Sequence, residues 1–176
     1  MPTFQQCLDA NPSQLMSLGV SIGSAAAQLT QLGAGYGQTV TGLAASWQGK
    51  DYQELVGWSM QVATFIGRSD AAMITCAGAL ETTGATMMAT VTAMKATKQA
   101  AEAIGYKVLP TPFVILGPSQ WSQVSSAGPG APAVLAAYQS GAIAFTTALI
   151  SMYTAIIAQD TAGYAVIRTA LALSPS

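Results

Sequence analysis

The side chains that most often perform acid–base or metal chemistry are scarce in this chain of 176 residues. It has no histidine, which is the usual general base and the commonest metal ligand. Its two cysteines, Cys7 and Cys76, lie far apart and form no CxxC or metal-binding pattern. A disulfide between them is one interpretation, and a pair of buried free thiols is the preferred one. We therefore predict no enzyme, no cofactor and no metal site.

Phosphate and nucleic-acid binding also lack their usual residues. The glycine-rich stretch at residues 33–37 is not followed by the Lys-Ser/Thr of a phosphate loop, so these glycines are predicted to serve conformation or packing. The formal net charge is −1 and no basic patch exists, which argues against a nucleic-acid partner.

The composition poses a question about the protein surface. Apolar residues make up 51% of the chain and charged residues 7%, against an ordinary share of about one quarter. Either Ser, Thr, Gln and Gly supply the polar faces, or a partner or a membrane covers apolar surface. The N-terminus has neither a basic nor an apolar signal region, which predicts cytoplasmic residence or export by a Sec-independent route.

The predicted elements are helices. Asn11-Pro12-Ser13 is a helix start signal, and apolar residues then recur at alternating spacings of three and four. Glycines in this helix each cost about 1 kcal/mol of helix propensity and would let a neighbouring helix approach closely. The predicted seam of this helix consists of Leu15, Leu18, Ile22, Leu29, Leu32, Tyr36 and Leu43.

A tight turn is predicted directly after this helix. The first helix ends at Ser46-Trp47-Gln48-Gly49, and Asp51 with Glu54 then has the form of a capping box. The second helix is predicted from about Lys50 to Ile104, with a break near residues 67–70. Its seam begins with Leu55, Trp58, Val62 and Phe65. The fold class predicted is therefore all-α, built on a long antiparallel helical hairpin with a W-x-G turn, a Pro-rich connector and one or more C-terminal helices.

The predicted organisation is a single helical domain with four segments. They are an N-terminal tail at 1–12, the hairpin at 13–105, a Pro/Gly-rich connector at 106–132 and a C-terminal helical segment at 133–172. The connector is predicted to be extended and to pack across the hairpin, with Trp121 as an anchor. The apolar run 140–158 is predicted to be a buried bundle helix, and insertion into a membrane is the alternative.

Trp47-x-Gly49 between two long amphipathic helices resembles the signature of the WXG superfamily, the helical hairpins carried by type VII (ESX) secretion systems of actinobacteria and their relatives. The Pro-rich connector and the Ala-rich helices beyond it resemble the PPE proteins and the larger ESX-secreted Esp proteins. The chain departs from these families in two respects: it lacks an N-terminal Pro-Pro-Glu, and no tyrosine is followed four residues on by Asp or Glu.

This resemblance implies a secreted or cell-surface protein that pairs with a small WXG-like or PE-like helical partner as a heterodimer. Trp47 and Gly49 would then form half of an export signal, and a secretion chaperone is a further candidate partner. Two alternatives from other classes are a membrane-associating protein and a self-assembling structural protein.

Overall fold

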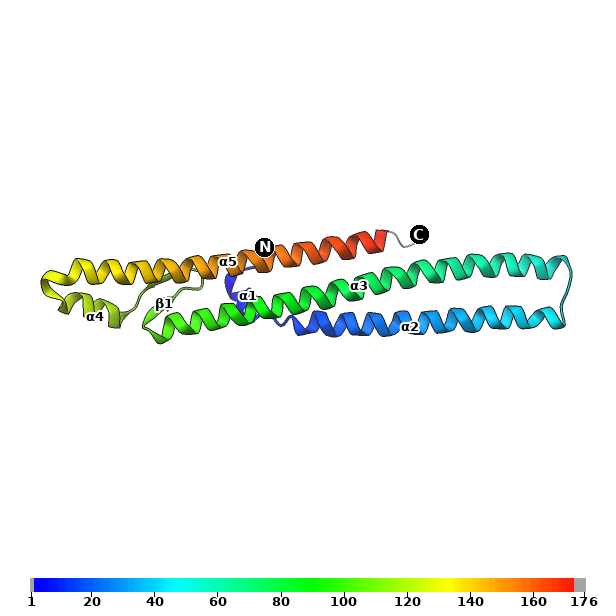
Figure 1. Cartoon of the computed structure of the whole chain (residues 1–176), viewed down its shortest axis with the longest axis horizontal. Helices are drawn as coiled ribbons and strands as arrows, with labels where there is room; N and C mark the ends of the chain where they lie inside the picture. The colour runs from blue at the N-terminus through cyan, green and yellow to red at the C-terminus, as the bar shows by residue number, and fades with distance from the viewer. Residues whose placement is uncertain (1, 173–176) are drawn as a thin grey trace. The chain divides into compact units, whose positions relative to one another are not determined.

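The computed structural model describes residues 2–172, and the protein is all-α apart from one small antiparallel sheet (Figure 1). This confirms that the protein is all-α, as predicted. The elements in chain order are α1 (Phe4–Asp9), α2 (Ser13–Gly42), the 3₁₀ turn η1 (Leu43–Ala45), α3 (Lys50–Ala103), β1 (Tyr106–Val108), β2 (Val114–Leu116), α4 (Pro118–Ser126), η2 (Gly128–Gly130) and α5 (Ala131–Ala172).

The single domain predicted from the sequence is resolved into two compact units. The first, the α2 unit, consists of Ser13–Gly84 and the described residues from Ala162 onward. The second, the connector unit, consists of Ala85–Thr161 and the described residues up to Pro12. Both α3 and α5 therefore contribute residues to each unit.

In the α2 unit, glycines allow α2 to approach α3 closely. A Cβ atom added at Gly19 would lie 2.8 Å from the carbonyl oxygen of Ala77, and one at Gly33 would lie 3.1 Å from Ile66. Because position 19 meets position 77 while position 33 meets position 66, the two helices run in opposite directions, as Figure 1 also shows. The prediction that α2 glycines permit close approach is confirmed at these positions, whereas Gly35 has open space around it.

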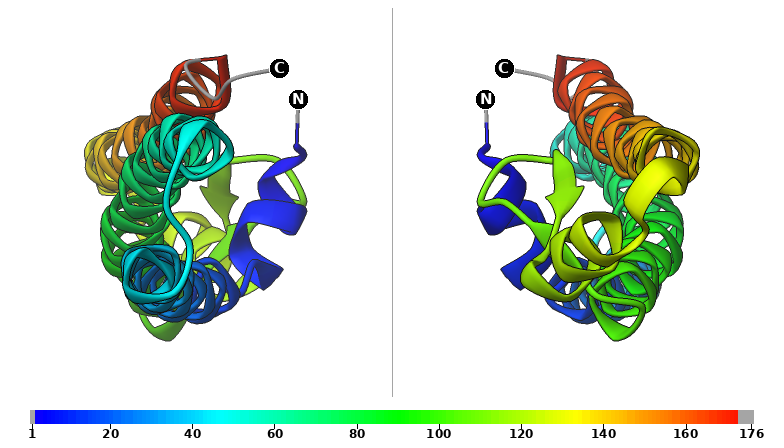
Figure 2. Two further views of the ribbon diagram at one scale, coloured as in Figure 1. Left: turned by 90° about the vertical axis from the view of Figure 1, so that its right-hand side faces the viewer. Right: turned by 90° about the vertical axis from the view of Figure 1, so that its left-hand side faces the viewer.

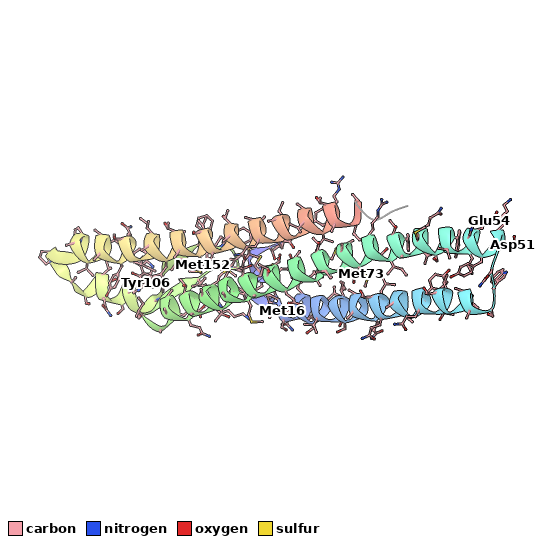
Figure 3. All side chains as sticks on the ribbon, turned by 45° about the vertical axis from the view of Figure 1, so that its right-hand side comes forward. Met16, Asp51, Glu54, Met73, Tyr106 and Met152 are labelled. Carbon is pink, nitrogen blue, oxygen red and sulfur yellow. The ribbon has the colours of Figure 1, made fainter. Side chains whose placement is uncertain are left out.

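The start of α3 differs from the sequence prediction. The helix begins at Lys50, so Asp51 lies inside its first turn and is not the N-cap residue of a capping box. Asp51 and Glu54 both lie at this end of α3 (Figure 3). A carboxylate in the first turn interacts favourably with the helix dipole, which explains why the acidic residues suit this place without capping it. The break predicted at residues 67–70 is also wrong, because α3 is continuous to Ala103.

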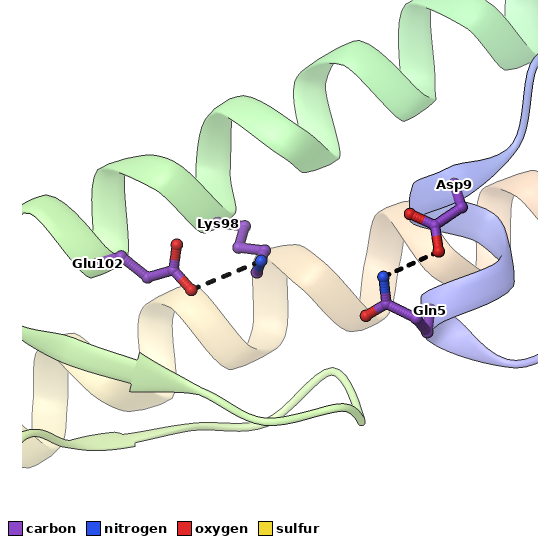
Figure 4. Close-up of polar contacts among 4 residues, drawn as sticks. All are labelled: Gln5, Asp9, Lys98 and Glu102. Carbon is purple, nitrogen blue, oxygen red and sulfur yellow. Dashed lines mark hydrogen bonds and ion pairs between the residues drawn. The ribbon is translucent and has the colours of Figure 1, made fainter.

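The connector unit contains an N-terminal helix where the sequence predicted only a tail. Thr3 caps α1, because its hydroxyl accepts a hydrogen bond from the Gln6 amide while the Gln6 side chain accepts one from the Thr3 amide. This reciprocal pair satisfies two amides that a short helix would otherwise leave unpaired. The buried face of α1 consists of Phe4, Cys7 and Leu8. On its exposed side, Gln5 donates to Asp9 over 3.0 Å (Figure 4).

The core of the connector unit lies between α1, α3 and α5. Met94 and Leu149 are fully buried, and the ring of Phe4 meets that of Tyr153 edge-on at 6.3 Å. Thr90 hydrogen-bonds Gln159 across the α3–α5 pair. Lys98 and Glu102 form an ion pair of 3.6 Å along α3 (Figure 4), and such i,i+4 pairs contribute about 0.3–0.5 kcal/mol.

The Pro-rich connector is more regular than predicted. β1 and β2 pair antiparallel with Lys107 opposite Ile115, and Pro110 and Pro112 lie in the loop between them, where no ladder donor is needed. Pro118 opens α4, because the first helical position tolerates a missing N–H. Trp121, which we predicted to act as an anchor, lies on α4 and is 52% exposed.

The apolar run 140–158, which we predicted to be a buried bundle helix, lies within α5 and is buried along one face only. Helical residues Gly128–Ala172 are long and apolar enough to cross a membrane, as the core helix of a soluble protein also can be, but only 17% of the most apolar window is buried. Burial follows a single line along α5 with one residue every seven, because the helix contacts its neighbours along one narrow face. The line consists of Ala142, Leu149, Ile156, Gly163 and Ala170.

Candidate partner-binding surface

The turn between α2 and α3 presents an exposed tryptophan beside a glycine that has a left-handed backbone. The Ser46 amide closes the 3₁₀ turn after α2 by donating to the carbonyl of Leu43, and the Trp47 amide donates to the same carbonyl over 2.8 Å. Gly49 has a φ of 114° and its carbonyl accepts the first hydrogen bond of α3, from Gln53. The left-hand view of Figure 2 looks onto this turn. The Trp47 side chain is 43% exposed.

The eleven predicted seam residues are not buried in the α2 unit. Leu18, Leu32, Trp58 and Phe65 are exposed, with Leu32 at 71%. The other seven are half-buried: Leu15, Ile22, Leu29, Tyr36, Leu43, Leu55 and Val62. Leu18, Leu32, Trp58 and Phe65 are therefore not buried between α2 and α3, whereas the other seven side chains are partly covered. We call these eleven residues the apolar strip, which is exposed in part.

A different set of α2 residues faces α3. Small residues recur every seven positions at Gly19, Ala26 and Gly33, and Val40 continues the line. Small side chains let the helix backbones approach, and the larger side chains on either side are then displaced outward from the contact. The sequence prediction followed the large apolar residues and missed this seven-residue spacing of small residues.

The α2 unit has two shallow apolar hollows, one of which includes residues of the apolar strip. One has a volume of about 420 Å³ and includes the seam residues Leu18 and Ile22 with Met73 of α3. The other has a volume of about 490 Å³ and is lined by Arg68 beside alanines and threonines. Both are built within the α2 unit. Apolar hollows of this kind suit side chains of a partner better than they suit a polar substrate.

Among residues 2–172, no group of three or more His, Cys, Asp or Glu could hold a metal ion. Cys7 and Cys76 are buried free thiols. Burial raises the pKa of the Cys7 thiol, and the nearby Asp160 carboxylate raises it further, so the reactive thiolate is disfavoured at neutral pH.

Comparison of the chain with protein-family models, with curated proteins and with solved structures found no match.

Replacing Gly49 should destabilise the turn. Gly49→Val places a β-branched residue at a φ of 114°, which should lower the free energy of unfolding by more than about 1 kcal/mol. Gly57→Ala is the control, since this α3 glycine has open space around it and alanine favours a helix. Thermal unfolding followed by circular dichroism measures both. Equal stability of the Gly49→Val variant and the wild type would show that this backbone conformation is not required.

Proposed function

We propose that this protein is a type VII (ESX) secretion-associated helical protein that pairs with a small helical partner for export and acts at the cell envelope or outside the cell. In this proposal, α2 and α3 form a WXG-type helical hairpin with Trp47-Gln48-Gly49 as its turn. The observation that carries the proposal is the partly exposed apolar strip on the α2 unit, in which Leu18, Leu32, Trp58 and Phe65 are exposed.

The strip has the spacing that a partner helix would recognise. Its α2 members recur at intervals of three, four and seven, which is the pattern that presents one face of a helix to another. Burying exposed side chains such as Leu32 and Phe65 stabilises a complex by roughly 25 cal/mol for each Å² of apolar surface removed from water. A helical hairpin from a WXG-like or PE-like protein could cover the strip as part of a four-helix bundle. The turn would then remain exposed for recognition by the secretion machinery.

Coexpression tests the pairing. We expect the protein expressed alone to self-associate or to melt at low temperature, and a cognate small helical protein encoded beside it to give a soluble heterodimer. Leu32→Lys should weaken that heterodimer at least tenfold, because it places a charge where apolar surface is to be buried. Ile104→Lys is the control, since Ile104 is 60% exposed and belongs to the connector unit.

Copurification and sedimentation would measure the pairing. A monodisperse wild-type monomer of high thermal stability, or equal partner binding by both lysine variants, would contradict the proposed dimerisation.

Membrane association is a second candidate function, favoured by the apolar and largely uncovered α5. The threonines and serines along α5 nevertheless make it a poor match for the bilayer interior, so we place secretion-associated pairing first. The two candidates are both compatible with the low charge of the chain.

Vesicle flotation separates the two candidates. We expect the wild type to purify without detergent and to stay out of the floating fraction with neutral phospholipid vesicles. Ile150 is 38% exposed on α5, so Ile150→Lys should keep the helical circular dichroism spectrum. Flotation of the wild type that is lost in a folded Ile150→Lys variant would favour membrane association instead.

A further inference from the structure

An apolar groove in the connector unit has the form of a ligand site. It lies between the β2 strand, the start of α4 and one face of α5, and its volume is about 700 Å³. Figure 2 shows these elements in its right-hand view. Binding sites for small organic molecules are commonly about 300–1,000 Å³ and mostly apolar. We call this space the connector groove, lined by Phe113, Val114, Ile115, Leu116, Trp121, Gln139, Ala142, Ile143, Thr146 and Thr147.

Hydrogen bonds hold the walls of the connector groove in place. The Val114 amide of β2 donates to the Thr146 hydroxyl of α5 over 2.9 Å. The Tyr106 hydroxyl of β1 donates to the carbonyl of Tyr138 over 2.9 Å. Each strand is therefore fastened to α5, which sets the strand-to-helix spacing. Preformed walls of this kind bind a ligand without a large ordering cost.

Hydrogen bonds also hold the start of α4 in place. Gln120 is 2% exposed, and its side chain accepts a hydrogen bond from Gly117 and donates one to the carbonyl of Ile104. These two hydrogen bonds of the buried Gln120 side chain join the start of α4 to the residue that follows α3. Trp121, the next residue, therefore has a fixed backbone position at the edge of the groove while its side chain is 52% exposed.

Most side chains around the groove are apolar, and several of them are exposed to solvent. Phe113, Ile115 and Ile143 are 52%, 43% and 66% exposed, so the hydrophobic effect favours a molecule that covers them. No charged residue occurs between Lys107 and Asp160, so the lining offers no partner to a charged ligand. The contact surface of the ligand must therefore be uncharged and apolar.

The polar groups indicate the shape of this ligand. Gln139 and Thr147 are both exposed and line the groove eight residues apart on α5, which is about 12 Å at a rise of roughly 1.5 Å per residue. Ala142 and Ile143 lie between them, so an apolar stretch has a hydrogen-bonding group at each end. We propose that the connector groove binds a single aliphatic chain of the fatty-acyl class, lying along α5 with a neutral polar end group at Gln139 or Thr147.

A second copy of this chain fits the groove less well. A two-fold contact brings the same surface of each copy together, and two concave surfaces do not fill each other. A slender chain, in contrast, can enter the hollow and contact both the β2 and the α5 walls.

Tryptophan quenching tests the proposal directly. In a Trp47→Phe/Trp58→Phe background, Trp121 is the remaining tryptophan and reports on the groove. A brominated monoacylglycerol, used below its micelle concentration, should quench its fluorescence saturably at one chain per protein. Ile143→Gln and, separately, Ile115→Gln should each weaken binding about tenfold, because each removes an apolar wall.

The matched control is Ile104→Gln, which changes a similarly exposed isoleucine of the same unit outside the groove and should bind like the parent. Circular dichroism verifies that each variant is folded. Quenching that does not saturate, or that is unchanged in both groove variants, overturns the proposal. So does quenching by brominated phospholipid vesicles but not by the monomeric chain, which would indicate docking on a bilayer. A dimer seen by light scattering and lost in Ile143→Gln would assign the groove to a second copy and would likewise overturn it.

Discussion

Trp47→Ala is expected to abolish export while the protein stays folded. The Trp47 side chain is 43% exposed, and the hydrogen bond of Trp47 to Leu43 is made by its backbone amide, so truncation leaves that bond in place. Surface substitutions of this kind usually change stability by no more than about 0.5 kcal/mol. If Trp47 is part of an export signal, the loss should appear in secretion and not in the melting temperature. Immunoblots of culture filtrate and cell lysate measure this.

Trp121→Ala is the matched control for this experiment. Trp121 is also about half exposed, at 52%, but lies on α4 in the connector unit. We expect the Trp121→Ala variant to be exported like the wild type. Normal secretion of a stably expressed Trp47→Ala variant would refute the export role and leave the helical fold untouched.

Gly19→Leu is expected to cause the largest loss of stability among α2 glycine substitutions. Even a Cβ at this position would lie 2.8 Å from the backbone carbonyl of Ala77, which cannot rotate away as a flexible side chain could. Leucine would force α2 and α3 apart, and overpacking of this kind costs about 1–3 kcal/mol or more. The midpoint of denaturant unfolding should fall accordingly.

Gly35→Leu provides the opposite expectation on the same helix. No atom lies within 4 Å of a Cβ added at Gly35, and leucine favours a helix over glycine by somewhat under 1 kcal/mol. This variant should therefore be as stable as the wild type or slightly more stable. Similar destabilisation by both leucines would contradict the close approach of α2 and α3 at Gly19.

Local sequence signals predicted the elements of this protein well. The start signal at Asn11-Pro12-Ser13 and the turn at residues 46–49 mark the bounds of α2 and α3 to within a few residues. Gly49 was predicted to end the first helix, and it has the positive φ, 114°, that glycine readily adopts at such an end. Such features depend on the preferences of neighbouring residues, so the sequence alone carries them.

Other elements depend on contacts with residues that are distant in the chain. α1 is only six residues long, and its capping box and its burial of Phe4 beside Tyr153 hold it together. The β1–β2 pair has strands of three residues, which are too short to show a period, and contacts with α5 at Tyr138 and Thr146 fasten them. The Thr3-x-x-Gln6 pattern of the capping box was legible in the sequence, whereas the contacts with Tyr153, Tyr138 and Thr146 were not.

For the candidate partner-binding surface too, the sequence determined some features and the tertiary structure determined others. By itself, the sequence determined that the chain is helical and nearly uncharged and that apolar residues recur along one face of α2. Only the tertiary structure decided which residues face inward: Gly19, Ala26 and Gly33 face α3, whereas Leu32 remains 71% exposed. The physical reason is that periodicity specifies which residues share a helix face. Which face is buried depends on how closely backbones can approach, and in this protein the small side chains allow the closest contact.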